Sequence, residues 1–217
     1  MTGDIIKVNV LATHMIANVS ETLASKLNLP NHFRSIGLIT TDCDDATYCA
    51  LDEATKAAAV EVVYGRSLYA GASNASTKYA GEVIGILAGP NPAEVESGLR
   101  AAIGFLESGV GFRSANSDDS VVYFAYTVSR TGTYLSKTAG VTEGEALAYL
   151  IAPPLEAMAG LDAAMKAADV ELVTLFEPPS ETNFGGGLLT GTQSACHAAA
   201  AAFGERVKEI AQRPREV

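Results

Sequence analysis

Residues 51–63 read LDEATKAAAVEVV and residues 161–173 read LDAAMKAADVELV, so one pattern is written twice in the chain. A second pair follows, because GILAG at Gly85–Gly89 is matched by GLLTG at Gly187–Gly191. Self-similarity at a spacing of about half the chain predicts a duplicated structural unit. We therefore predict two tandem domains, residues 1–109 and residues 110–217.

The match continues upstream of these runs. Leu38-Ile39 corresponds to Leu150-Ile151, and Ile16–Leu29 has a fainter counterpart in Val128–Val141 that aligns Leu23 with Leu135. The copies therefore share the order of their elements.

Each copy is predicted to begin with a short strand followed by a helix. The β-prone runs are Ile36–Thr40 and Ala148–Ile151. Asp44 and Asp45 stand where an N-cap and a first-turn acid belong, while the second helix opens at Pro153-Pro154.

The rest of each copy follows one plan. A strand, Val60–Val63 or Val170–Leu175, leads into a Gly/Ser/Pro-rich loop, Tyr64–Ala80 or Phe176–Gly186. Loops of that length are either functional or simple connectors, and their matched position favours function. Another strand and a helix, opening at Asn91-Pro92 or Thr192-Gln193-Ser194, complete the copy. The expected class is an α/β sandwich with helices on a mixed sheet.

Composition narrows the function. With 48% hydrophobic and 18% charged residues the chain can bury a globular core. The net charge of −10 and the scattered basic residues argue against nucleic acid as a partner. The N-terminus lacks a signal pattern and no window is long and apolar enough for a bilayer, so we expect neither membrane nor export. Three cysteines without C-x-x-C spacing fit a reducing, cytoplasmic location.

Catalytic and metal-binding patterns are missing from the sequence. No G-x-S-x-G motif, recognised Cys/His pattern or phosphate-binding loop with Lys occurs. His14, His32 and His197 stand far apart in the sequence, so no metal site is predicted. We expect neither an enzyme nor a cofactor.

Specific motifs carry a family resemblance. Ser35–Thr41 (SIGLITT), Leu51–Ala58 (LDEATKAA) and Val60–Val63 (VEVV) resemble the bacterial-microcompartment shell domain, and the second copy repeats the likeness. Two copies resemble the tandem type of the family, specifically its ethanolamine-utilisation branch. The runs that carry this closer likeness are Thr41–Tyr48, Asp52–Lys56, Val63–Gly71, Gly81–Val83, Gly89–Glu94, Ser129–Gly132 and Ala152–Ala157.

The resemblance implies a fold and an assembly. It implies two circularly permuted, ferredoxin-like shell domains in a flat homotrimer that mimics a hexamer. Such tiles join other shell proteins at their edges, form a microcompartment shell, and carry a gated central pore for metabolites. Each subunit would also have a small pore that binds ethanolamine.

The resemblance also implies a ligand site for ethanolamine. Its positions are Asp44, Asp45, Glu82, Phe112, Thr182, Asn183 and Phe184. Carboxylates suit the ammonium group of an amino alcohol. Capping alone would explain Asp44 and Asp45, and Glu82 could be a solvated strand end.

Two other functions compete with the shell tile. One is an amine-binding sensor without a role in shell assembly, and the other is an enzyme using the same acids. A general acid or base would need a reactive partner within hydrogen-bond reach, and the sequence offers none.

Overall fold

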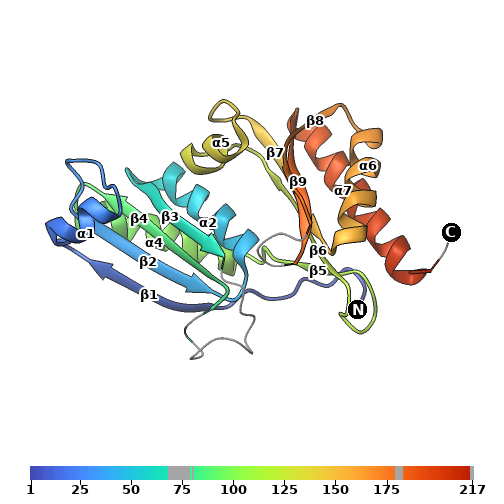
Figure 1. The fold of residues 1–217 in the computed structure, drawn as a ribbon, viewed down its shortest axis with the longest axis horizontal. Coiled ribbons are helices and arrows are strands. Elements are labelled where there is room, and N and C mark those ends of the chain that lie inside the picture. Colours follow the sequence, from blue (N-terminus) through green and yellow to red (C-terminus); the bar gives the residue numbers. More distant parts are fainter. Residues whose placement is uncertain (68–78, 80, 179–182, 216–217) are drawn as a thin grey trace. The chain divides into compact units, whose positions relative to one another are not determined.

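The computed structural model describes residues 1–67, 79, 81–178 and 183–215, which form two compact units (Figure 1). The N-terminal unit comprises Val8–Val110 with Gly132–Leu135. The C-terminal unit comprises Met1–Lys7, Gly111–Thr131 and Ser136–Val217. Each unit thus takes in a short segment from the other half of the chain.

The N-terminal unit is a four-stranded sheet with helices on it. Its elements are β1 (Val10–Ile16), α1 (Glu21–Lys26), β2 (Ser35–Thr41), α2 (Asp44–Ala57), β3 (Glu61–Ser67), β4 (Val83–Gly89) and α4 (Pro92–Glu107). The strand order is β1-β2-β4-β3.

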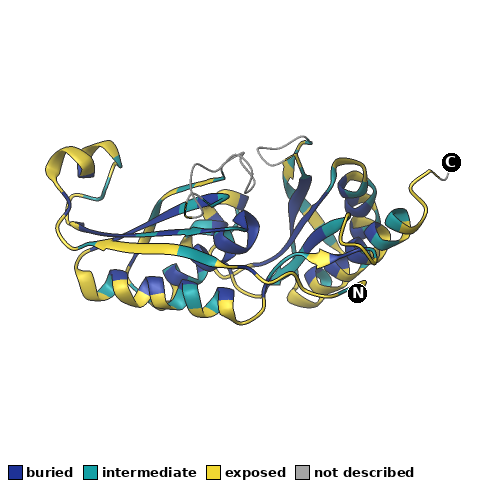
Figure 2. Cartoon of the chain, turned by 90° about the horizontal axis from the view of Figure 1, so that it is seen from below, coloured by how far each residue is buried: buried dark blue, intermediate teal, exposed yellow. Residues whose placement is uncertain are grey.

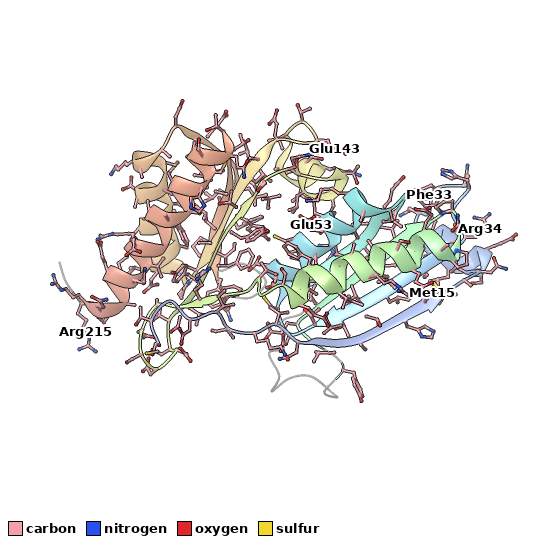
Figure 3. All side chains as sticks on the ribbon, turned by 180° about the vertical axis from the view of Figure 1, so that it is seen from behind. Met15, Phe33, Arg34, Glu53, Glu143 and Arg215 are labelled. Carbon is pink, nitrogen blue, oxygen red and sulfur yellow. The ribbon has the colours of Figure 1, made fainter. Side chains whose placement is uncertain are left out.

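Glycines on one face of this sheet let α2 and α4 pack closely on it. A Cβ at Gly85 would lie 2.7 Å from Leu51 of α2, and one at Gly37 would lie 2.8 Å from Leu99 of α4. On the opposite face, α1 covers a smaller cluster that includes Ala24, Phe33 and Ile36. Phe33 of this cluster is labelled in Figure 3. The sheet is therefore covered by α2 and α4 on one face and partly by α1 on the other.

The C-terminal unit repeats this plan. Its elements are β5 (Arg113–Ser114), β6 (Val122–Val128), α5 (Thr133–Ala139, whose first three residues belong to the N-terminal unit), β7 (Ala146–Ala152), α6 (Pro154–Ala167), β8 (Val170–Phe176), β9 (Gly185–Gly191) and α7 (Gln193–Gln212). The strand order is β5-β6-β7-β9-β8. Phe203 of α7 and Leu161 of α6 are buried in one cluster with Leu150 and Leu189 of the sheet. Figure 2 colours the buried parts of the helices and strands dark blue.

The duplication is visible in the hydrogen-bond register. The β3–β4 ladder is irregular between Val62 and Tyr64, and the β8–β9 ladder is irregular at the equivalent place, between Leu172 and Thr174. A repeated bulge at one position indicates one backbone plan used twice.

One pairing predicted from the sequence is wrong by one residue. Leu38 lies opposite Ile86, and Tyr149 lies opposite Leu188, so Leu38-Ile39 corresponds to Tyr149-Leu150 and not to Leu150-Ile151. Two residues separate β2 from α2, whereas Pro153 alone separates β7 from α6. The shorter connection shifts the strand alignment while the helix alignment stays the same.

The α/β sandwich is confirmed, but the sheets are not mixed. Every ladder between the described strands is antiparallel. β2 and β3 run in the same direction across the α2 connection, yet β4 lies between them and is antiparallel to both. The unit is thus a split β-α-β arrangement, which leaves no parallel neighbours.

The two long loops are shorter than predicted. β3 continues to Ser67, β8 includes Phe176, and β9 starts at Gly185. The central parts of the loops, residues 68–78 with residue 80 and residues 179–182, lie outside the described residues. Within the described part of the chain, no helix is both long and apolar enough to cross a membrane.

Candidate functional site

Asp44 and Asp45 open helix α2, and both are almost fully buried, with 8% and 6% of their surface exposed. Asp44 is the first helical residue and not the predicted N-cap. The N-cap is Cys43, whose side chain makes no capping bond. Thr41 Oγ1 accepts a hydrogen bond from the Cys43 N–H at 3.1 Å, and Asp44 Oδ1 accepts one from the Asp45 N–H at 2.9 Å within the first turn.

A short hydrogen-bond chain fixes the Asp44 carboxylate. Ser67 Oγ donates to Asp44 Oδ2 at 2.7 Å, and the Tyr48 hydroxyl lies 2.5 Å from Ser67 Oγ. Since Ser67 donates its proton to Asp44, Tyr48 donates to Ser67. Burial raises the pKa of Tyr48, so its hydroxyl keeps the proton that this chain requires. Asp44 is therefore held in one orientation by β3 and by the next turn of α2.

Glu82 belongs to the same acidic cluster. Its backbone N–H donates to Thr41 O at 2.8 Å, just ahead of β4. Partial burial raises the pKa of Glu82, and the carboxylates of Asp44 and Asp42 raise it further. The field at Glu82 therefore disfavours a further negative charge and favours a cation.

The remaining predicted ligand positions belong to the C-terminal unit. The rings of Phe112 and Phe184 stack with centroids 5.7 Å apart, and Phe112 also meets Phe124 at 5.6 Å. Asn183 is exposed and has a φ of 64°, a left-handed conformation that Asn tolerates. Thr182 lies outside the described residues.

The predicted site residues thus form two groups, each within one unit. Asp44, Asp45 and Glu82 lie in the N-terminal unit, whereas Phe112 and Phe184 lie together in the C-terminal unit.

Sequence reasoning missed three side chains that shape the acidic group. Asp42 adds a negative charge that raises the pKa of Glu82. The Asp42 carboxylate is itself held by Asn9, whose Nδ2 donates to Asp42 Oδ2 at 2.6 Å. Ser67 and Tyr48 orient Asp44. The spacing of Tyr48 four residues after Asp44, on the same helical face, was a usable signal. Ser67 gave none, since it was assigned to a loop.

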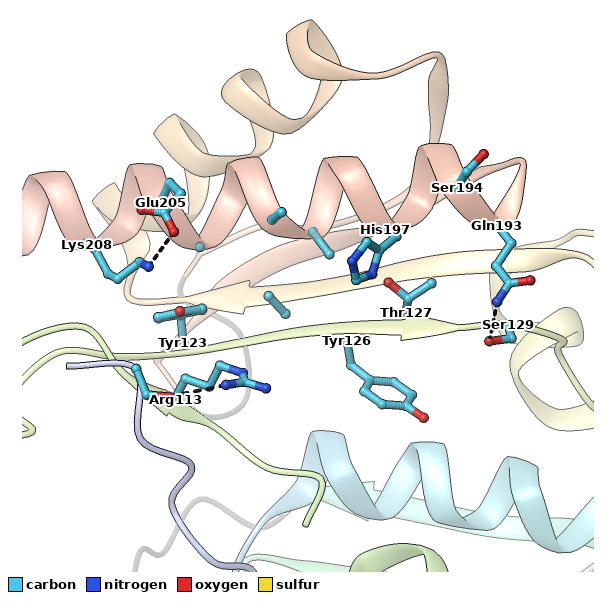
Figure 4. A pocket seen from close by; sticks show the side chains of 15 residues that line it. Arg113, Tyr123, Tyr126, Thr127, Ser129, Gln193, Ser194, His197, Glu205 and Lys208 are labelled. Carbon is cyan, nitrogen blue, oxygen red and sulfur yellow. Dashed lines mark hydrogen bonds and ion pairs between the residues drawn. The ribbon is translucent and has the colours of Figure 1, made fainter. Parts of the chain in front are cut away.

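A groove of about 940 Å³ in the C-terminal unit was also not predicted (Figure 4). It lies between α7 and β6, where Gly204 and the neighbouring alanines leave room. Its cationic groups already have partners, since Lys208 pairs with Glu205 and Arg113 donates to Gly3 O at 3.2 Å. No ligand chemistry is assigned to it.

Thiol and metal chemistry find little support in the described residues. Burial, with the charge of Asp45, raises the pKa of the Cys43 and Cys49 thiols, which therefore stay protonated. Among the residues that the structure describes, no three His, Cys, Asp or Glu side chains are grouped to hold a metal ion.

Comparison with known proteins gives a consistent result. The model of the BMC domain family matches residues 35–115. The chain is 67% identical to the bacterial microcompartment shell protein EutL of Clostridium perfringens, covering 99% of both chains. It is 56% identical to EutL of Salmonella typhimurium, over 97% of this chain and 96% of that protein.

Comparison with solved structures indicates the same family. The crystal structure of the ethanolamine utilization protein EutL from Leptotrichia buccalis has a TM-score of 0.98 to this chain, at 65% identity and with 100% of both chains covered. Because these relatives are shell proteins, the role of the chain is structural, in a microcompartment shell, and not enzymatic. The chain belongs to the EutL family of bacterial microcompartment shell proteins.

Proposed function

We propose that this shell protein works as a homotrimeric tile in which two permuted shell domains, residues 1–109 and 110–217, mimic a hexamer. Three copies of a duplicated chain supply six similar domains around one axis. The repeated strand order and the repeated bulge support two equivalent building blocks. Such tiles would join other shell proteins at their edges.

A central pore that opens and closes follows from the same proposal. The segments assigned to it are the loops within residues 64–80 and 176–186, of which residues 68–78, 80 and 179–182 lie outside the described residues. Open and closed forms should differ in these loops while the helices stay in place.

We further propose that the chain binds ethanolamine through Asp44, Asp45, Glu82, Phe112, Thr182, Asn183 and Phe184. The observation that supports it most is that the buried Asp44 and Asp45 share one acidic cluster with the half-buried Glu82. Burial raises the pKa of Glu82 and the charges of Asp44 and Asp42 raise it further, so an ammonium group would be stabilised there. The stacked Phe112 and Phe184 supply an apolar surface suited to the two methylene groups.

Removing one carboxylate should remove binding without removing the assembly. Isothermal titration calorimetry of Asp45→Ala and of Glu82→Gln should show ethanolamine affinity lowered by about tenfold or more, the value of one hydrogen bond to a charged group. The control is Glu96→Gln, since the exposed Glu96 only pairs with Arg100 on α4. Undiminished binding in both site variants would refute the assignment. A monomeric protein that binds ethanolamine would favour the sensor instead.

Binding should also depend on pH. Because the pKa of Glu82 is raised, this carboxylate takes up a proton at a higher pH than an ordinary glutamate. Ethanolamine affinity should be full above the raised pKa and fall as the pH drops through it, since protonation removes a negative charge from the site. Calorimetry across this range measures the effect.

Asp118→Asn is the control for the pH series. Hydrogen bonds from Ser120 lower the pKa of the exposed Asp118, so this carboxylate takes up a proton only at a lower pH than Glu82 does. Its pH profile should match the wild type. A wild-type affinity that does not change on acidification would contradict the role of Glu82.

A further inference from the structure

Residues 3–6, here called the N-terminal segment, pair through their backbone with β5 in the C-terminal unit. The Gly3 N–H donates to Ser114 O at 2.8 Å, and the Ser114 N–H donates to Asp4 O at 3.0 Å. Ser114 is fully buried. The segment therefore supplies partners for backbone groups that have no access to water.

The segment also holds Phe112, just ahead of β5. The Ile6 N–H donates to Phe112 O at 2.8 Å, and Ile5 forms an antiparallel bridge with Arg113. The Arg113 guanidinium adds a bond to Gly3 O at 3.2 Å, which Figure 4 draws as a dashed line. The backbone that carries the Phe112 ring is thus fastened to the segment on the side of Ile6.

The Phe112 ring contacts two other rings of the same unit. Its centroid lies 5.6 Å from that of Phe124, which is fully buried on β6, and 5.7 Å from that of Phe184. Phe124 is a fixed support, whereas Phe112 and Phe184 form the apolar side of the proposed ethanolamine site. Because aromatic contacts depend on centroid distance and ring orientation, a shift of the Phe112 backbone would change both of them.

Backbone bonds, and not buried side chains, keep the segment in place. Ile5 is 43% exposed and Ile6 is 40% exposed. A segment with few buried apolar contacts opens locally at a lower free energy than the core does. A ligand that needs Phe112 in its paired position would therefore favour the closed form of the segment.

We propose that Ile6 is a positioning residue for ethanolamine binding, acting through the bond from its N–H to the carbonyl oxygen of Phe112. Ethanolamine binds the form in which the segment is paired and not the form in which the segment has opened. The effect is reciprocal, because a ligand selective for the paired form also stabilises the pairing. This role rests on the proposed ethanolamine site and adds to it a residue outside the predicted ligand set.

Removal of the Ile6 N–H tests this role. Proline has no N–H, and it favours an extended residue before it, as Ile5 is in its bridge. Calorimetry of Ile6→Pro should show ethanolamine affinity lowered about fivefold, the value of one backbone hydrogen bond. The control is Ile6→Ala, which keeps the N–H and shortens only an exposed side chain, so its affinity should stay within about twofold of the wild type.

Hydrogen exchange of the wild-type protein tests the reciprocal effect and does not depend on how well the proline variant folds. With ethanolamine at ten times its Kd, the Gly3 and Ile6 N–H groups should exchange about tenfold more slowly, because only the paired form binds. The control is the Gly144 N–H, which donates to Thr131 O in the same unit and should exchange at an unchanged rate. A segment with a merely structural role would show no dependence on the ligand.

Three results would overturn the role of Ile6 and leave the ethanolamine site in place. The first is a folded Ile6→Pro protein that binds ethanolamine as tightly as the wild type. The second is an Ile6→Ala protein that binds as weakly as Ile6→Pro, which would assign the effect to the side chain. The third is exchange at Ile6 that ethanolamine slows no more than exchange at Gly144. A wild-type protein that binds no ethanolamine would remove the site and this role together.

Discussion

Asp52→Ala should lower the free energy of unfolding by about 3 kcal/mol or more, an effect well beyond that of an average substitution. The side chain is 1% exposed, and it is the acceptor for both the Gly132 and the Leu135 N–H groups. Alanine would leave two backbone donors without an acceptor in a buried place, and it would remove the ion pair of Asp52 with Lys56. Thermal unfolding followed by circular dichroism should show a midpoint lowered by about 6–12 °C.

The duplication supplies a matched control for this variant. Asp162 occupies the equivalent position of α6, but its side chain is 60% exposed and it only pairs with Lys166. Asp162→Ala should therefore change stability by about 0.5 kcal/mol or less, as expected for a surface ion pair. Equal effects of the two substitutions would contradict the role of Asp52 as the anchor of α5.

Gly186→Ala is expected to destabilise the C-terminal unit by about 4 kcal/mol or to prevent its folding, because alanine is strained at this φ and its Cβ would overlap a backbone atom. Gly186 has a φ of +155°, and a Cβ there would lie 1.9 Å from the carbonyl oxygen of Leu150 in the neighbouring strand. Since that oxygen belongs to the backbone, relief requires β9 to separate from β7. Urea unfolding followed by far-UV circular dichroism measures the loss.

Gly104→Ala is the comparison for the glycine variant. Gly104 lies within helix α4, and a Cβ there meets no atom within 4 Å. Alanine has the higher helix propensity, so this variant should gain about 0.5–1 kcal/mol. A Gly186→Ala protein as stable as the wild type would show that β7 and β9 are less closely paired than described.

The sequence was most informative where the information is local. The repeated runs at 51–63 and 161–173 combine a helical period with a β-prone ending, so the α/β plan of each copy followed directly. The helix starts at Asn91 and Thr192 were also predicted correctly, because both side chains cap their helices.

Features that depend on distant partners could not be predicted. Which strands become neighbours depends on how the chain crosses from one element to the next. The antiparallel pairing and the one-residue shift at β7 are therefore visible only in the hydrogen-bond register. The N-cap of α2 differs from the prediction, because the helix begins one residue earlier: Cys43 is the N-cap, and Asp44 accepts the Asp45 N–H at 2.9 Å from within the first turn.

In the candidate site, too, the features that depend on distant partners could not be predicted. Burial of Asp44 and its bond from Ser67 depend on how β3 continues past Tyr64, which the Gly-rich composition of that segment hid. Similarly, the assignment of Met1–Lys7 to the C-terminal unit comes from backbone bonds such as Ile6 N–H to Phe112 O, at 2.8 Å, which carry no side-chain pattern. The ligand set itself stays a prediction.

The central claim is that the duplicated chain assembles as a trimeric tile. Native mass spectrometry of the purified wild-type protein tests it most directly. A dominant species at three times the 22.5 kDa mass of the chain is the predicted result. A chain that remains monomeric at micromolar concentration, with no larger species, would contradict the account.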